Sequence, residues 1–204
     1  MLRDGLVAVV ISETAYLLLI VAVAGERCFE LVLSRRNARL AFSRGGIEVG
    51  RRHYRVMVTV HVLFLLACAA GSLIRDRPFA PAVGVVALVG TIIAQALRYW
   101  TIVSLGKRWN TRVITVPGES PITGGPFRYL RHPNYLAVCV ELLCLPMIRG
   151  LWITAIAFSA ANAVLMCVRI PAEERALGAM YAAAFASRRR LIPKIVLSRP
   201  RAQP

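Results

Sequence analysis

Long apolar runs separated by arginine-rich segments constrain this chain more than any other feature. A helix needs about 20 mostly apolar residues to cross the hydrocarbon core of a membrane. The sequence contains five runs of this kind: Leu6–Leu33, Val56–Ile74, Ala82–Val103, Tyr135–Ile148 and Leu151–Val168. Hydrophobic residues make up 57% of the 204 residues, more than an ordinary soluble domain contains. The sequence therefore predicts an all-α integral membrane protein with about five transmembrane helices.

The fourth and fifth runs differ from the others. The fourth is short, and only Arg149-Gly150 separates it from the fifth. We therefore expect the two to form a tight helical hairpin that need not reach across the membrane. An alanine-rich stretch follows from Pro171 to about Ser187. Because proline suits the first turn of a helix, this stretch is predicted to form a short, separate cytoplasmic helix.

The charge balance is strongly basic, with 26 Lys and Arg against 10 Asp and Glu. In a soluble protein this excess would suggest a nucleic-acid partner. Here the basic residues gather in segments 35–55, 104–134 and 169–201, between or after the apolar runs. Loops rich in Lys and Arg stay on the cytoplasmic side, so five spans place the N-terminus outside. We expect a multi-pass protein of a bacterial-type inner membrane, with no nucleic-acid partner.

Ionisable residues inside a span are costly and mark functional sites by default. Glu26, Arg27 and Glu30 lie near the cytoplasmic end of the first run, where an ion-paired helix end is the favoured interpretation. His61, in the second run, is more typical of a hydrogen-bonded packing residue. The five cysteines lie in or beside apolar runs and form no CxxC pair, so we expect neither a metal site nor a disulfide framework.

Glu141 lies well inside the fourth run with no basic residue nearby in sequence. A buried carboxylate is suited to accept a proton from a hydroxyl of moderate acidity. The alternative is a structural ion pair with Arg98 or Arg169 of a neighbouring helix. Both roles stay open at the level of sequence.

The segment GGPFRYLRHPNY, residues 124–135, lies where the chain enters the fourth run. Pro133 can occupy the first turn of the next helix, whose free N–H groups favour a carboxylate or phosphate. The segment also supplies guanidinium donors and aromatic rings: Arg128, Arg131, Phe127, Tyr129 and Tyr135. It therefore predicts a site for an anionic, nucleotide-like ligand, although clusters of this kind also bind lipid head groups.

The segment RIPAEERAL, residues 169–177, follows the fifth run. If the hairpin closes, Glu173 and Glu174 return beside His132 and Tyr135. Acidic groups next to a basic pocket suit a zwitterion with ribose hydroxyls, such as S-adenosylmethionine, whose sulfonium is also attracted to aromatic rings. The alternative is a charged first turn of the following helix.

GPFRYLRHPNY followed by RIPAEERAL resembles the isoprenylcysteine carboxyl methyltransferase family of integral-membrane enzymes, over about residues 95–193. The resemblance implies S-adenosylmethionine as cofactor. By resemblance, these residues match positions that line the cofactor site: His132, Tyr135, Arg169, Glu173 and Glu174. The predicted cofactor-binding residues are Arg128, Tyr129, Leu130, His132, Tyr135, Glu173 and Glu174. Arg169 and Glu141 are the predicted catalytic residues. Leu191-Ile192-Pro193 is similar to the family's closing segment. We expect one domain, with three spans in 1–103, the cofactor-binding catalytic region in 104–193 and a disordered tail in 194–204.

The upstream segments ERCFELVLSRRNARLAFSRGGIEVGRRHYRVMVTVH and RYWTIVSLGKRWNTRVITVPG look like a bacterial branch associated with type III polyketide synthases. The resemblance implies O-methylation of alkylresorcinols or alkylpyrones, ahead of a prenylcysteine-type carboxylate. We expect the alkyl tail to lie in lipid, with Arg98, Trp109 and Asn110 as substrate-side groups. For Trp109 and Trp100 taken alone, an interfacial anchor is the favoured role.

Two other functions remain open from the sequence. Membrane sterol reductases carry a similar RHPNY-like segment beside NADPH, but a 2′-phosphate would call for more basic and fewer acidic residues than Glu173-Glu174 supply. A non-catalytic lipid-binding protein would explain the arginines but not the acids that converge on His132. The expected partners are a lipophilic small-molecule substrate and membrane lipid; the sequence carries no signal for an oligomeric state.

Overall fold

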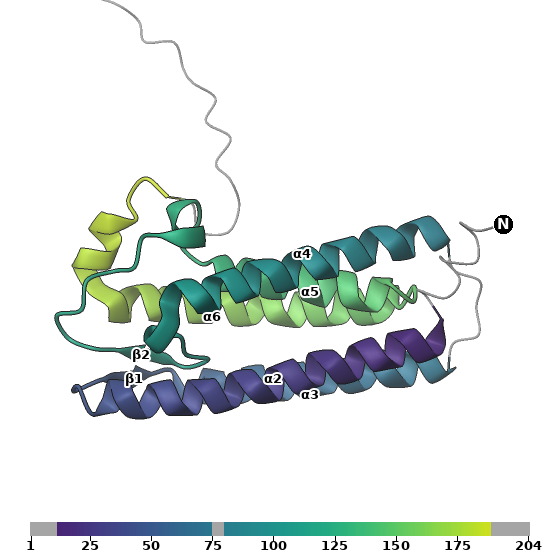
Figure 1. The fold of residues 1–204 in the computed structure, drawn as a ribbon, viewed down its shortest axis with the longest axis horizontal. Coiled ribbons are helices and arrows are strands. Elements are labelled where there is room, and N and C mark those ends of the chain that lie inside the picture. The colour runs from purple at the N-terminus through teal and green to yellow at the C-terminus, as the bar shows by residue number, and fades with distance from the viewer. Residues whose placement is uncertain (1–11, 75–79, 189–204) are drawn as a thin grey trace, which may run out of the picture.

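The computed structural model describes residues 12–74 and 80–188 of the chain. The start of the first predicted span, the segment Leu191-Ile192-Pro193 and the tail 194–204 lie outside the described residues. The described residues form five α-helices: α2 (Glu13–Phe42), α3 (Arg51–Ile74), α4 (Pro81–Leu105), α5 (Pro133–Met147) and α6 (Trp152–Ala184). Figure 1 shows α2 and α3 side by side in one layer, with α4, α5 and α6 in another.

Three of the described helical segments are long and apolar enough to cross a membrane: Arg51–Ile74, Pro81–Arg108 and Trp152–Ala184. This agrees with an integral membrane protein and with three of the five predicted spans. α2 has 30 residues, but its apolar stretch meets charges at Glu26-Arg27. α5 has 15 residues and is as short as the sequence predicted.

The hairpin of α5 and α6 is confirmed, because the two helices are joined by a tight turn in which Gly150 has a φ of 67°. The separate helix expected to start at Pro171 is wrong. α6 continues through Pro171 as far as Ala184, and its backbone departs from helical geometry at Gly178, where φ is 73°. A proline inside a helix removes one hydrogen bond, whereas glycine reaches positive φ without steric cost. One helix therefore carries Glu173 and Glu174 out of the apolar region.

A small antiparallel sheet adds to the all-α architecture that the sequence predicted. Its strands are β1 (Ile47–Val49) and β2 (Val113–Thr115), with Ile47 opposite Thr115. β1 comes from the α2–α3 connection, and β2 follows α4 and the short 3-10 helix η1 (Gly106–Arg108). The sheet lies at the end of the bundle where α6 finishes (Figure 1). It thereby ties the two helical layers together at that end.

The apolar core joins α2, α3 and α5. Tyr16 and Phe64 are each 1% exposed, and Leu145 is fully buried. α4 packs closely on α5 because Gly90 has no side chain: a Cβ there would lie 2.6 Å from the Sγ of Cys144. Since lipid tails are as apolar as leucine, such contacts stabilise helix association through close packing more than through removal from water.

Candidate active site

A cavity of about 580 Å³ runs between the two layers and under the sheet. Its wall takes residues from all five described helices and from both strands. The volume lies within the range of about 300–1,000 Å³ that small-molecule and cofactor sites occupy. Seven of the predicted site residues line it: Arg98, Trp109, Asn110, His132, Tyr135, Arg169 and Glu173.

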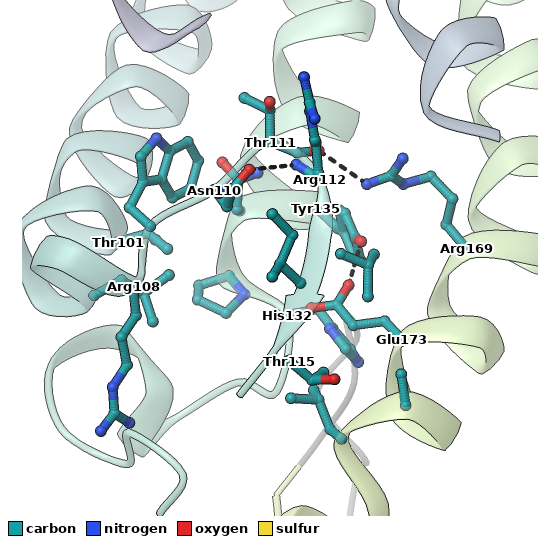
Figure 2. A pocket seen from close by; sticks show the side chains of 18 of the residues that line it. Thr101, Arg108, Asn110, Thr111, Arg112, Thr115, His132, Tyr135, Arg169 and Glu173 are labelled. Atoms are coloured by element: carbon teal, nitrogen blue, oxygen red, sulfur yellow. Dashed lines mark hydrogen bonds between the residues drawn. The ribbon is translucent and has the colours of Figure 1, made fainter. Parts of the chain in front are cut away.

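The start of α5 and the outer part of α6 meet beside this cavity. His132 precedes Pro133, which begins α5 as the sequence predicted. The Nε2 atom of His132 lies 3.1 Å from the Oε1 atom of Glu174, and the Tyr135 hydroxyl donates a hydrogen bond to Glu173. Figure 2 shows Tyr135 and Glu173 pointing toward each other and joined by this hydrogen bond. The expected convergence of the two motifs is therefore confirmed.

Aromatic and basic groups complete this end of the cavity. The His132 and Tyr135 rings stack, with centroids 5.3 Å apart and planes 23° from parallel. Arg169 is 4% exposed and its guanidinium carbon lies 5.9 Å from the centre of the Tyr135 ring. Arg131 places its Nη1 atom 3.8 Å from Oε1 of Glu174. Opposite charges and flat rings thus share one wall, as a zwitterion with a base ring requires.

The loop after α4 forms the facing wall, and α2 holds it in place. Asn37 donates through Nδ2 to the Trp109 carbonyl at 2.8 Å, and Ser34 donates through Oγ to Oδ1 of Asn110 at 2.7 Å. Arg169 donates through Nη2 to the Thr111 carbonyl at 3.2 Å, a bond drawn in Figure 2. Because the Asn110 amide is engaged by the fold, its direct role is to shape the loop.

Trp100 and Trp109 differ in their surroundings. Trp100 is 48% exposed and suits an interfacial anchor, as expected. Trp109 is 2% exposed and lines the cavity, so the anchor interpretation is wrong for this residue. The hydrogen bond from Asn37 draws its backbone against α2, away from the surface.

A charged cluster occupies the inner end of the cavity, within the apolar part of the bundle. Arg98 donates through Nη2 to Glu141, and its Nη1 atom lies 3.7 Å from Oε2 of Glu30. Arg27 donates through Nη1 to Glu30 at 3.2 Å and through Nη2 to Gln95 at 3.2 Å. The ion-paired helix end predicted for α2 is confirmed, and it extends to α4 and α5.

Glu141 is 3% exposed and is not among the residues that line the cavity. Its contact with Arg98 is the structural partnership that the sequence left open. A catalytic role for Glu141 stays a prediction.

Four predicted cofactor-site residues are not part of the cavity wall: Arg128, Tyr129, Leu130 and Glu174. Glu174 still contacts the wall through His132, whereas the other three do not point toward it. They lie at or just after η2 (Gly125–Arg128), which turns Phe127 inward and leaves Arg128 and Tyr129 exposed. Tyr129 instead has its ring 6.4 Å from that of Trp100.

Sequence reasoning missed part of the lining: Arg27, Glu30, His61, Thr111 and Arg112. Glu30 and His61 carried a signal, because they are ionisable residues in apolar runs, but they were assigned structural roles. Nothing in the local pattern marked Thr111 or Arg112.

Six lining residues have buried polar atoms with no hydrogen-bond partner within residues 12–74 and 80–188. Three of these atoms belong to the inner charged cluster: Nε of Arg27, Oε1 of Glu30 and Nε of Arg98. The other three lie toward the sheet: Nε1 of Trp109, Oδ1 of Asn134 and Nε of Arg169. Buried polar groups are normally bonded, so these atoms mark positions for a polar ligand. Two donors and an acceptor, next to carboxylates and stacked rings, suit the amino-acid head, ribose and adenine of S-adenosylmethionine. Fold and cavity define a helical membrane protein with a cavity that is lined by both polar and apolar residues.

Comparison with known proteins agrees with this class. The profile of the isoprenylcysteine carboxyl methyltransferase (ICMT) family matches residues 85–179. The uncharacterized protein YpbQ of Bacillus subtilis is 37% identical over 161 residues, which span 78% of this chain and 95% of that protein. An uncharacterized protein of Haemophilus influenzae is 26% identical over 156 residues, or 76% of this chain and 90% of that protein.

The chain belongs to the ICMT family. Membership makes it a membrane methyltransferase of a family whose enzymes use S-adenosylmethionine. It also favours methyl transfer over the NADPH-dependent reduction that the RHPNY segment left open.

Proposed function

We propose that this protein transfers a methyl group from S-adenosylmethionine to a hydroxyl of a lipophilic ring compound, of the alkylresorcinol or alkylpyrone type. The observation that carries the proposal is the pairing of His132 with Glu174 and of Tyr135 with Glu173 beside a membrane-embedded cavity. It joins the two motifs that the ICMT family resemblance rests on.

The cofactor end of the cavity follows from the charges present. Glu173 and Glu174 supply acceptors for an ammonium group and ribose hydroxyls, while Arg169 offers a guanidinium to a carboxylate. The stacked rings of His132 and Tyr135 offer a face to the adenine or the sulfonium. When bound, S-adenosylmethionine supplies an electrophilic methyl group. Residues of this chain then hold the acceptor oxygen in line with that group.

The acceptor end is lined by apolar side chains of α2 and α3: Leu31, Met57, Val58, Val62 and Leu65. Val62 also keeps 52% of its surface exposed, on a helix apolar enough to face lipid. An alkyl tail can therefore lie along this wall and continue into the bilayer. Arg98 and the unpartnered Nε1 of Trp109 supply polar groups to the same cavity.

The sheet end of the bundle is proposed to face the cytoplasm. The arginine-rich segments 35–55 and 104–134 both belong to this end, and such segments are retained on the cytoplasmic side. A water-soluble cofactor then enters from the side where it is made.

Binding of S-adenosylhomocysteine tests the proposal. Detergent-purified protein, titrated by calorimetry, is expected to bind S-adenosylhomocysteine with one site per chain and to give no heat with NADPH. Glu174→Gln is expected to weaken binding, while Glu13→Gln, which removes a carboxylate from the first turn of α2, leaves it unchanged. NADPH binding alone would assign a reductase. If the protein bound neither compound, a non-catalytic lipid-binding protein would be the remaining interpretation.

A further inference from the structure

We infer that His61 takes the proton from the acceptor hydroxyl during methyl transfer. The inference rests on the proposed function and deepens it. It names a base, which a hydroxyl acceptor needs and a carboxylate acceptor does not. His61 lies on α3, outside the segment 85–179 that the family profile matches.

The chemistry of the acceptor decides whether a base is needed. In methylation of a hydroxyl, the oxygen lone pair forms the new O–C bond, and the C–S bond breaks with its electron pair passing to sulfur. The O–H proton must leave to a base. A carboxylate is already ionised at neutral pH, so its methylation releases no proton. A base in the acceptor end of the cavity therefore indicates a hydroxyl substrate.

The carboxylates of the inner cluster are poorly placed for this role. Glu141 does not line the cavity and is paired with Arg98. Glu30 lines the cavity, but its Oε2 accepts from Nη1 of Arg27 at 3.2 Å and lies 3.7 Å from Nη1 of Arg98. Its Oε1 has no hydrogen-bond partner within the described residues, yet it lies 3.2 Å from the same Arg27 nitrogen and stays ion-paired. An incoming proton would have to displace these ion pairs.

His61 has a nitrogen lone pair that no ion pair engages. Its Nδ1 atom lies 2.9 Å from the Met57 carbonyl, one helical turn earlier. A carbonyl can only accept, so Nδ1 carries the hydrogen and the neutral ring keeps its lone pair on Nε2. Within residues 12–74 and 80–188, Nε2 has no hydrogen-bond partner. The intrahelical bond predicted for a packing histidine is present, and it also orients the ring as a base.

The position of His61 matches the path of the acceptor. It follows Arg51, the first residue of α3, by ten positions, or about 15 Å along the axis at ~1.5 Å per residue. The apolar residues around it in the cavity wall are Met57, Val58, Val62 and Leu65. The ring of an acceptor whose tail follows this wall is thus presented to His61.

The inner cluster can tolerate the positive charge that forms on the imidazole. Arg27 and Arg98 bring two guanidiniums, against the three carboxylates of Glu26, Glu30 and Glu141. These are the charged groups that α2, α4 and α5 contribute beside this part of α3, while α6, which packs along α3, adds one charge of each sign to the cavity wall, Arg169 and Glu173. The cluster as a whole therefore has one negative charge left over, which balances a protonated His61 until the proton is released.

The test compares two acceptors with the same alkyl tail, an alkylresorcinol and its ring-nitrated counterpart. The nitrated ring is much more acidic and needs little help from a base. His61→Gln is expected to lower kcat for the alkylresorcinol by roughly 10²–10³-fold, the size of a general-base contribution. With the nitrated acceptor the loss is expected to shrink below about tenfold, since Brønsted behaviour reduces the contribution of a base as the acceptor grows more acidic.

His53→Gln is the matched control, because His53 lies on the same helix and does not line the cavity. It is expected to keep wild-type turnover on both acceptors. Both variants are expected to bind S-adenosylhomocysteine as the wild type does, a readout that also reports folding. Equal losses of His61→Gln on the two acceptors, or no loss on either, would overturn the role of His61.

The wild-type protein provides a second measurement that does not depend on folding of a variant. Its kcat for the alkylresorcinol should rise with pH through the range in which histidine titrates, well below the pH of about 10 at which a phenol itself ionises. A flat profile for the alkylresorcinol contradicts the inference. If the protein methylated a carboxylic acid with the same alkyl tail, and neither of the two hydroxyl acceptors, the inference would also be contradicted. The proposed methyltransferase activity would still stand. Failure of the wild type to bind S-adenosylhomocysteine would instead remove the proposed function itself.

Discussion

The ion pair between Arg98 and Glu141 provides the sharpest test of how the inner cluster is held together. Each residue is 3% exposed. Breaking a buried pair by removing one partner costs about 3–5 kcal/mol, because a charge is left uncompensated. In Arg98→Met, Oε2 of Glu141 keeps a weaker ion pair with Nη2 of Arg27, at 3.9 Å. We therefore expect a loss near the lower end of that range, about 3 kcal/mol.

The double variant Arg98→Met/Glu141→Leu separates the orphaned charge from loss of packing. Apolar residues of similar volume often replace a buried pair at little cost, and Glu30 keeps its contact with Arg27. We expect the free energy of unfolding of the double variant to lie within about 1 kcal/mol of the wild-type value.

Thermal unfolding in detergent, followed by tryptophan fluorescence, measures both effects. For a chain of this size, about 3 kcal/mol corresponds to a fall in Tm on the order of 10 °C. Arg39→Met, at an exposed position of α2, is the control and should leave Tm unchanged. A double variant as unstable as Arg98→Met alone would refute the explanation by an unpaired charge.

Four further outcomes are expected. Glu141→Gln keeps a hydrogen bond to the neighbouring guanidinium, so its turnover should stay within about threefold of wild type, whereas a loss of about 10²-fold would make Glu141 the base. Gly90→Ala should lower stability by about 1 kcal/mol through its clash with Cys144, and Cys144→Ala in the same chain should restore Tm; no rescue would contradict the packing explanation. Glu174→Gln should weaken S-adenosylhomocysteine binding by about 10–100-fold, the effect of one charged hydrogen bond, and unchanged calorimetric affinity would exclude Glu174 from the site. Ser120→Cys, at an exposed position after β2, should react with an impermeant thiol reagent only in inside-out vesicles, and labelling in intact cells would reverse the proposed orientation.

The part of the site on the hairpin could be predicted from sequence because short-range constraints determine it. His132 and Glu174 lie at the membrane edge of two helices joined by a tight turn, so closing the hairpin brings them together. Pro171 misled the prediction, because a helix-start rule was applied where the apolar helix simply continues. Tyr129 was predicted at the cofactor site because it lies near His132 in the sequence. In the structure, η2 turns Tyr129 away from the cavity.

The rest of the site depends on features that one sequence does not display. Glu30 and His61 are visible as polar residues in apolar runs, but whether they face a cavity depends on how α2 and α3 rotate against α4. The strands Ile47–Val49 and Val113–Thr115 have three residues each, too few for an alternating pattern to be detected. Their pairing is long-range and is determined by the positions of the helices around them.

Transfer of an isotopically labelled methyl group tests most directly whether this cavity joins cofactor and acceptor. The purified protein would be given labelled S-adenosylmethionine and a synthetic alkylresorcinol in mixed micelles, and the products analysed by mass spectrometry. The predicted result is an alkylresorcinol methyl ether carrying the label, formed in step with S-adenosylhomocysteine and abolished in Glu173→Gln. If no labelled alkylresorcinol were formed, or if Glu173→Gln transferred the label as well as the wild type, the assignment of this cavity would be contradicted.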